Sequence, residues 1–240
     1  MSEMQTVHEG LGCRSICIIP ARGGSKRLLN KNIVDINGSP LISYSIRAAI
    51  GSGVFDKVIV STDSEKIKEV AEEEGAEVPF LRPEHLATDE SLVEDTICHV
   101  LEYLENKNDK YDYVCLAQCS APMVLPEDFK NVISIAREKE ARIVVSVAET
   151  SYNINWVGKL REDMSMENFF GSCKTRCQDF EKTYILNGSI YFGEWDVFYN
   201  KENYYSKKTF AYVMPQERSY DIDTKDDLEL VRYLMGNKNA

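Results

Sequence analysis

The fold is decided by the stretch Ile16-Cys-Ile-Ile-Pro-Ala-Arg-Gly-Gly-Ser-Lys-Arg-Leu-Leu-Asn-Lys-Asn32. Its first four residues are apolar and end in two β-branched side chains, which predicts a buried strand. Pro20 ends this strand because it has no N–H to give to a neighbouring strand. The loop that follows contains two glycines, one serine and four basic side chains, Arg22, Lys26, Arg27 and Lys31.

This loop has the composition of a phosphate-binding site. Gly23 and Gly24 would allow the backbone to reach positive φ and to approach a ligand closely. Consecutive N–H groups in such a loop bind anions, and the basic side chains add positive charge. The loop matches neither the Walker pattern nor the dinucleotide fingerprint. A solvated surface turn is the alternative, but open α/β sheets bind ligands at the carboxyl ends of their strands, which favours a site here.

The composition is that of an ordinary globular protein. The chain has 240 residues, of which 43% are hydrophobic and 28% charged, and its net charge is −11. We therefore expect one domain over residues 13–240, preceded by a flexible leader at 1–12. The negative charge disfavours general nucleic-acid binding. No apolar run is long enough to span a membrane, so we expect neither a nucleic-acid nor a membrane partner.

The cysteines predict a reducing, cytoplasmic environment, because the chain has seven of them and its first residues lack the pattern of an export signal. Three pairs have a spacing that some zinc sites use: Cys13/Cys17, Cys115/Cys119 and Cys173/Cys177. Cys17 and Cys115 fall inside apolar strand runs, where cysteine acts as a small hydrophobic residue. That role is favoured over zinc binding.

Strands and helices alternate along most of the chain, which predicts a parallel sheet with helical crossovers. Further strands are expected at 58–60, 113–118, 143–147, 188–192 and 209–213, and helices after Pro40, at 64–74, up to 104, from 126 and from 224. Thr224 and Asp227 have the spacing that caps the last helix. The periodicity fails over residues 149–183, and a long irregular stretch in a compact domain is usually functional or an interface.

The segment Pro20-Ala-Arg-Gly-Gly-Ser-Lys26, followed by Lys31-Asn32, resembles the opening motif of the acylneuraminate cytidylyltransferases, the CMP-sialic acid synthetases. The resemblance implies an α/β fold with a Rossmann-like, three-layer, mostly parallel sheet of the nucleotide-diphospho-sugar transferase type. It also implies a small dimerisation extension at 149–183 and a homodimer with a shared active site. The implied partners are CTP and a nonulosonic acid, and the implied cofactor is Mg²⁺.

An acidic pair, Asp221 and Asp223, precedes the last helix. Alternation in an extended segment places both carboxylates on one side, and Mg²⁺ prefers carboxylate and triphosphate oxygens. In the family that the chain resembles, this Asp-x-Asp holds the metal. One alternative is a polar turn at a helix start. Another is the Asp-x-Asp of a glycosyltransferase with Mn²⁺, which usually lies mid-chain and leaves the basic loop unexplained.

Three further segments resemble family motifs. Arg82-Pro83 with Leu86-Ala87-x-Asp89 resembles the second motif, in which the arginine helps to bind the nucleotide. Gln118-Cys-Ser-Ala-Pro122 resembles a sugar-binding segment, but Cys119 replaces a proline, and Val124 stands where an arginine is expected. The resemblance therefore does not say how this loop is braced. Arg176-x-Gln178, Tyr184 and Asn187-Gly188 resemble the rest of the sugar-binding stretch.

We therefore expect CMP transfer from CTP to the anomeric hydroxyl of a nonulosonic acid, such as sialic acid or a close bacterial analogue, with release of pyrophosphate. The alternatives are another acid sugar, such as a keto-deoxy-octulosonate, and a nucleotide-binding regulator without turnover. The expected catalytic residues are Arg22, Lys31 and Asp223, and the metal ligands are Asp221 and Asp223. The expected nucleotide-binding residues are Ala21, Arg22, Gly23, Gly24, Ser25, Lys26, Lys31, Asn32 and Arg82. The expected acceptor-binding residues are Gln118, Arg176, Gln178, Tyr184 and Asn187.

Overall fold

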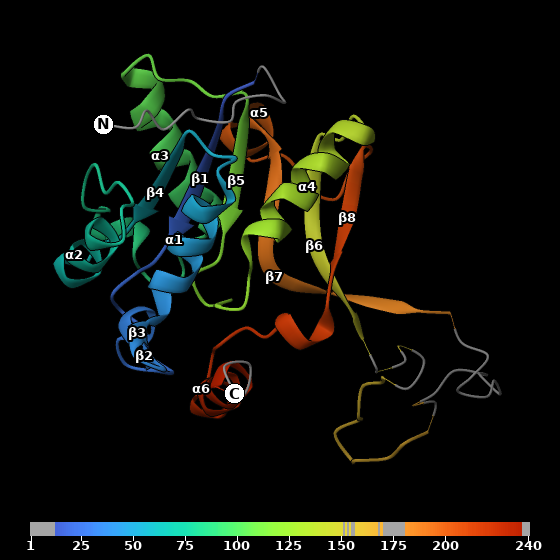
Figure 1. The fold of residues 1–240 in the computed structure, drawn as a ribbon. Coiled ribbons are helices and arrows are strands. Elements are labelled where there is room, and N and C mark those ends of the chain that lie inside the picture. Colours follow the sequence, from blue (N-terminus) through green and yellow to red (C-terminus); the bar gives the residue numbers. More distant parts are fainter. Residues whose placement is uncertain are drawn as a thin grey trace.

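A six-stranded sheet forms the centre of the molecule, with the strand order β4-β1-β5-β7-β6-β8 (Figure 1). The computed structural model describes residues 13–150, 152, 154, 157–167, 169 and 181–236. β7 pairs antiparallel with both of its neighbours, and the other pairs are parallel. The predicted mostly parallel sheet is therefore confirmed. The strands are β1 (Ser15–Pro20), β4 (Lys57–Ser61), β5 (Tyr113–Ala117), β6 (Ile143–Thr150), β7 (Thr183–Glu194) and β8 (Thr209–Met214).

Helices cover both faces of the sheet and give the expected three layers. Because successive side chains of a strand point to opposite faces, Cys17 and Ile19 of β1 pack on one face, and Ile16 and Ile18 pack on the other. The first face is covered by α1 (Leu41–Ser52), α2 (Glu65–Glu73) and α4 (Pro126–Glu138), and the second by α3 (Val93–Asn106) and α5 (Trp195–Tyr199).

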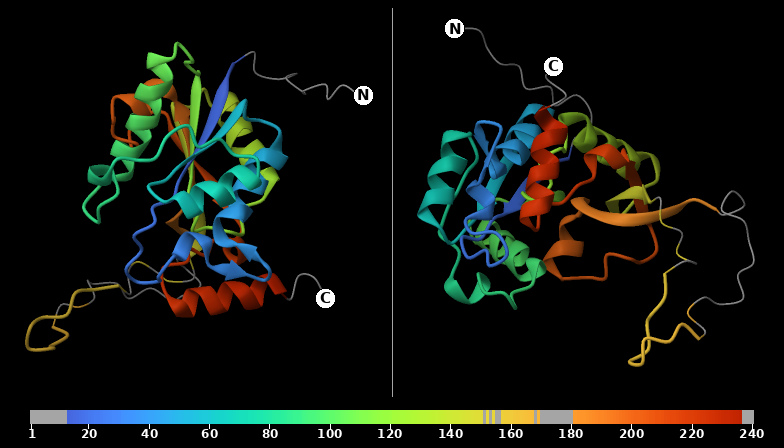
Figure 2. Two further views of the ribbon diagram at one scale, coloured as in Figure 1. Left: turned by 90° about the vertical axis from the view of Figure 1, so that its left-hand side faces the viewer. Right: turned by 90° about the horizontal axis from the view of Figure 1, so that it is seen from below.

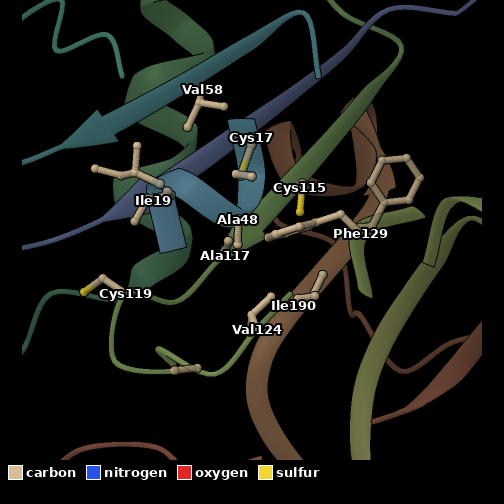
Figure 3. Close-up of a cluster of buried hydrophobic side chains, with 14 of the residues drawn as sticks. Cys17, Ile19, Ala48, Val58, Cys115, Ala117, Cys119, Val124, Phe129 and Ile190 are labelled. Atoms are coloured by element: carbon tan, nitrogen blue, oxygen red, sulfur yellow. The ribbon is translucent and has the colours of Figure 1, made fainter. Parts of the chain in front are cut away.

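The apolar cluster on the first face includes the buried thiols of Cys17 and Cys115 (Figure 3). These two cysteines are opposite each other in the register of β1 and β5. Both side chains are fully buried, and all the cysteines within the described ranges are free. They pack as small hydrophobic residues, in agreement with the interpretation of their positions in strands.

The C-terminal helix, α6 (Lys225–Gly236), packs below the sheet against the small hairpin of β2 (Asp35–Ile36) and β3 (Ser39–Pro40) (Figure 2). Ile222, Leu228 and Val231 share a buried cluster with Ile36 and Leu41. The predicted cap is present, since the Asp227 N–H donates to Thr224 Oγ1 at 3.2 Å. This packing brings the segment before α6 to the carboxyl ends of β1 and β5.

β7 begins five residues earlier than the strand predicted at 188–192, and β6 continues to Thr150. The ends of the stretch predicted to be irregular, at 149, 150 and 183, therefore lie in strands. The pairing of β6 with β7 shifts between Val145 and Val147, and Gly188 has a φ of 69°. This irregularity interrupts the two-residue alternation at Gly188, where the predicted strand began, so the residues of β7 before Gly188 were not predicted as strand. Beyond it, the two strands form an arm that extends away from the sheet (Figure 1).

Candidate nucleotide-binding site

A cleft of about 580 Å³ lies at the carboxyl ends of β1 and β5. It is formed by segments that are far apart in the sequence: the basic loop after β1, the segment between α2 and α3, the loop after β5 and the segment before α6. Its lining residues are Pro20, Arg22, Ser25, Lys26, Arg27, Lys31, Asn32, Arg82, Leu86, Thr88, Asp89, Ser91, Val93, Thr96, Gln118, Cys119, Ser120 and Asp223.

The basic loop and the acidic pair meet directly at this cleft. Lys31 Nζ donates to Asp223 Oδ1 at 3.0 Å and to the Ile222 carbonyl at 2.8 Å. Arg27 Nη1 donates to the other carboxylate oxygen of Asp223 at 2.8 Å. The hydrogen bond from Lys31, helped by the charge of Arg27, holds the pKa of Asp223 below its usual value.

The other two basic side chains share a second carboxylate, that of Asp89. Arg22 Nη2 lies 2.8 Å from Asp89 Oδ1, and Lys26 forms an ion pair with the other oxygen. Arg22 Nη1 also donates to the Thr88 carbonyl at 2.7 Å. Lys26 and Arg22 lower the pKa of Asp89. Asp89 belongs to the segment that resembles the second family motif, but it was not among the residues predicted to form the site.

The two glycines act differently from the expectation, because neither Gly23 nor Gly24 has positive φ. A Cβ added to Gly23 would lie 3.0 Å from Ser64 Cβ, so close packing is what requires glycine there. The Gly23 N–H donates to Asp63 Oδ1 at 2.8 Å, so this amide has a protein partner. A Cβ on Gly24 would have nothing within 4 Å.

Ala21 and Asn32 hold the basic loop in place through hydrogen bonds. Ala21 is buried outside the cleft lining, and its N–H donates to the Ser61 carbonyl at 2.9 Å. The side-chain amide of Asn32 lines the cleft but donates to the Arg22 carbonyl at 2.8 Å. Its oxygen lies 3.0 Å from Cys119 Sγ. These contacts fix the backbone of the loop rather than leaving the amide free for a ligand.

Arg82 is a buried cation at the wall of the cleft, with only 6% of its surface exposed. Its Nε donates to Ser61 Oγ at 3.1 Å, and its Nη2 donates to the Ser61 carbonyl. Burial lowers its pKa to about 10. These partners are a hydroxyl and a carbonyl, and Arg82 Nη1 also lies 3.5 Å from the Leu86 carbonyl, so the guanidinium places a buried positive charge at the cleft wall.

The loop after β5 supplies Gln118, Cys119 and Ser120 to the cleft. Burial raises the pKa of the Cys119 thiol to about 12, so this cysteine is a neutral packing group and not a nucleophile. Its thiol occupies the position of the expected proline and contacts Asn32, which lies in the basic loop. Cys119 therefore links the two loops.

The acidic pair offers oxygen atoms of the kind that Mg²⁺ prefers. Asp223 lines the cleft, whereas Asp221, two residues before it, is not among the lining residues and would have to turn toward the cleft to share a cation with Asp223. Desolvation raises the pKa of Asp221, although Ser120 and Lys31 oppose this shift. Within the described ranges, no group of three or more metal-ligating side chains is present, so two carboxylates would need oxygen atoms from a ligand or from water.

Tyr184 and Asn187, two of the remaining acceptor-binding predictions, do not line this cleft. Tyr184 is half exposed on the arm, and Asn187 is buried with its amide bonded to Ser146 and Ser219. The polar atoms of Asn187 have protein partners here, and its contact with the acceptor stays a prediction. Arg176, Gln178 and the leader at 1–12 lie outside the described residues.

Among the helices of the described ranges, none has the length and apolarity that crossing a bilayer requires.

Comparisons with known proteins point in one direction. A family model described as cytidylyltransferase matches residues 16–239. The chain is 36% identical over 222 residues to a pseudaminic acid cytidylyltransferase of Campylobacter jejuni, covering 92% of this chain and 96% of that protein. It is 34% identical to an N-acylneuraminate cytidylyltransferase of Streptococcus agalactiae, covering 89% of this chain and 51% of that protein.

The fold also matches a solved structure of CMP:2-keto-3-deoxy-manno-octonic acid synthetase complexed with CTP. The TM-score is 0.70 at 18% sequence identity, and the match covers 94% of this chain and 99% of the other. At this identity the similarity concerns the fold alone.

Proposed function

The chain belongs to the acylneuraminate cytidylyltransferase family and is a nucleotidyltransferase, and from this premise we propose that it transfers CMP from CTP to the anomeric hydroxyl of a nonulosonic acid. The hydroxyl oxygen attacks the α-phosphorus, the bond to the bridging oxygen of the β-phosphate breaks, and pyrophosphate leaves. The relatives named for two different nonulosonic acids are about equally similar, so the acceptor is proposed as a class.

The observation that supports this proposal most strongly is the contact between Lys31 and Asp223, 192 positions apart, in the wall of one cleft. Phosphoryl transfer needs positive charge around the triphosphate and a fixed geometry for attack. The cleft offers four cations, together with the buried guanidinium of Arg82.

The cations are balanced in pairs by Asp89 and Asp223. We propose that the triphosphate oxygens replace these carboxylates as partners of Arg22, Lys26 and Lys31. The exchange would keep each of these cations paired, and the displaced carboxylate of Asp89, which is 38% exposed, would be solvated by water. One of these cations would then stabilise the departing pyrophosphate.

Asp221 and Asp223 would hold Mg²⁺, as proposed from the sequence. When bound, Mg²⁺ would supply further charge neutralisation at the α-phosphate. For Asp223 to take part, its carboxylate would have to leave Arg27 and Lys31, and the triphosphate would take its place at Lys31.

We propose that the acceptor enters beside Gln118, which lines the cleft next to the acidic pair. Arg176, Gln178 and Tyr184 are proposed to contact the acceptor from the partner of a homodimer, with the segment 149–183 exchanged between subunits. Large apolar side chains of this segment and of the arm are exposed, among them Ile154, Val157, Met164 and Ile185. Such a concentration of exposed apolar surface is typical of an interface. We expect the enzyme to act in the cytoplasm.

The test is an acceptor panel. Pyrophosphate release from CTP and Mg²⁺ would be measured with N-acetylneuraminic acid, pseudaminic acid and a keto-deoxy-octulosonate, with UTP as the control nucleotide. We expect release with CTP and at least one nonulosonic acid. Binding of CTP without release from any acceptor would refute the proposed reaction.

A second measurement concerns the basic loop. Arg22→Ala should weaken CTP binding by roughly 10-fold, because a charge-assisted hydrogen bond is lost, and should leave the KM for the acid sugar nearly unchanged. Lys66→Ala, on the exposed surface of α2, serves as the charge-matched control.

A further inference from the structure

A buried ion pair between Asp128 and Arg218 lies beside the cleft, outside the residues that line it. Arg218 Nη2 donates to Asp128 Oδ1 at 2.8 Å, and Nη1 donates to Oδ2. The side chains are only 1% and 13% exposed for Asp128 and Arg218, respectively. Burial alone would raise the pKa of Asp128, but hydrogen bonds from Arg218, Leu125 and Tyr212 outweigh it and keep the pKa below its usual value.

This pair joins the two segments that carry the chemistry. Arg218 ends a 3₁₀ turn, Gln216–Arg218, three residues before Asp221. Asp128 lies in the first turn of α4, accepts from the Leu125 N–H at 2.7 Å, and so holds the end of the loop that begins at Gln118. Arg218 Nη1 also donates to the Met123 carbonyl at 3.3 Å, inside that loop.

Two further hydrogen bonds close the frame around the acidic pair. The Ile222 N–H, between Asp221 and Asp223, donates to the Ser120 carbonyl at 2.9 Å. On the other side, Asn187 Nδ2 donates to Ser219 Oγ at 3.0 Å. The backbone of the acidic pair is therefore fixed relative to the loop that carries Gln118, with Arg218 at its base.

Val124, which stands where the family has an arginine, does not hold the loop after β5 through a polar contact. Val124 is 5% exposed and packs in the apolar cluster on the first face of the sheet, shown in Figure 3. A charged side chain there would be buried among apolar groups. The guanidinium that contacts this loop belongs instead to Arg218, in the same segment as the acidic pair.

We propose that Arg218, held by Asp128, is a positioning residue that sets Asp223 against the basic loop and against Gln118. This inference rests on the proposed function. A buried ion pair often adds little net stability, so we infer that its main effect here is to fix the position of this segment. Only arginine can make the two-pronged contact and reach Met123 as well, because lysine is a single point donor.

The test compares Arg218→Lys with Arg142→Lys. Arg142 also makes a two-pronged contact, with Glu202 at 2.8 and 3.1 Å. However, it lies at the amino end of β6, and the cleft lies at the carboxyl ends of the strands. We expect Arg218→Lys to lower kcat by at least ~10-fold with the KM for CTP within ~3-fold, because misplaced catalytic groups lose rate more than binding. Arg142→Lys should retain kcat, and its loss of melting temperature should be smaller, because its ion pair is about one-third exposed.

A readout independent of turnover is the hydrogen exchange of the Ile222 amide. Arg218→Lys should speed its exchange by roughly 10-fold, because the segment loses its anchor, whereas Arg142→Lys should not. If Arg218→Lys fails to fold, Tyr212→Phe removes one hydrogen bond to Asp128, of 2.7 Å, and leaves the ion pair. This variant should lower kcat by roughly 2- to 5-fold at an unchanged KM for CTP.

The outcomes separate the two proposals. A wild-type enzyme inactive with every acceptor refutes the proposed function, and the exchange of Ile222 still decides the role of Arg218. Wild-type turnover with kcat and Ile222 exchange unchanged in Arg218→Lys overturns the positioning role. The same is true if Arg142→Lys loses as much kcat, because the effect would then be one of general stability.

Discussion

At the scale of single residues, Asp223 balances two of the four cations of the cleft. Its two carboxylate oxygens accept separately from Arg27 and Lys31. These contacts keep its pKa low, so the group remains a carboxylate at neutral pH. The same oxygens are therefore available both to pair with the loop and to take part in metal binding once a triphosphate occupies the cations.

The first prediction is that Asp223→Asn lowers kcat by roughly 10²-fold or more, because a preorganised charge at the reacting phosphate is lost. CTP binding, measured by calorimetry, should not weaken, since the cations of the loop lose a competitor. The matched control is Asp226→Asn, an exposed acid in the first turn of α6. Full turnover in Asp223→Asn would remove the metal assignment.

The two glycines of the basic loop give a second, paired prediction. Gly23→Ala should destabilise the protein by about 1 kcal/mol, because the new Cβ meets Ser64 and the loop must shift. Gly24→Ala should leave the melting temperature unchanged, since its Cβ enters open space. Thermal unfolding of both variants checks this, and equal losses would contradict the packing explanation.

At the scale of elements, charged side chains join the amino ends of β1, β4 and β5, at the end of the sheet opposite the cleft. Asp109, before β5, accepts from Lys57 of β4 at 2.9 Å and from Arg14, which precedes β1, at 2.7 Å. Three neighbouring strands therefore share one carboxylate. The hydrogen bond from Lys57 is the main reason that the pKa of Asp109 is lowered.

A pH dependence follows, and it is the third prediction. Because the pKa of Asp109 is lower in the folded protein, its stabilisation is fully present above the unfolded value of about 3.9 and is lost as the pH falls through the folded value. Asp109→Asn should be less stable at pH 7 by about 1 kcal/mol. The difference in the free energy of unfolding between this variant and the wild type, measured in urea, should shrink below about pH 4. A difference that stays constant from pH 7 to about pH 3 would contradict this explanation.

At the scale of the whole molecule, the arm of β6 and β7 is the feature that a single subunit leaves unexplained. Tyr184, Ile185 and Leu186 are 49%, 59% and 48% exposed in a strand that continues a buried sheet. Three consecutive exposed apolar residues would be costly for an isolated subunit. We propose that a homodimer buries them, which would account for the length of the arm.

The fourth prediction is that Ile185→Glu converts the proposed dimer into monomers, because a charge in the apolar part of an interface is desolvated without a partner. Light scattering after size-exclusion chromatography measures the mass. Turnover should fall with the dimer if the partner completes the site. Leu230→Glu, equally apolar and 42% exposed on α6, is the control. A monomeric wild type would contradict the proposal.

The layers of the fold and the charged groups that line the cleft could be predicted from local patterns of residues. The apolar run before Pro20, the glycines and cations after it, and Asp221 and Asp223 near the end are local patterns, and local patterns predict strands, loops and charge. They led to a basic loop at the end of β1 and to an acidic pair before α6, which the structure places within 3.0 Å of each other at Lys31 and Asp223.

Only the tertiary structure decided which charges meet. The partnership of Arg22 and Lys26 with Asp89, the packing of Gly23 on Ser64 and the brace from Arg218 to Asp128 all join residues far apart in the chain. The irregularity at Gly188 likewise hid the first half of β7 from the pattern. Periodicity reports which face of an element is buried, but the partner of a polar group is set by how the elements pack, and no local pattern contains that information.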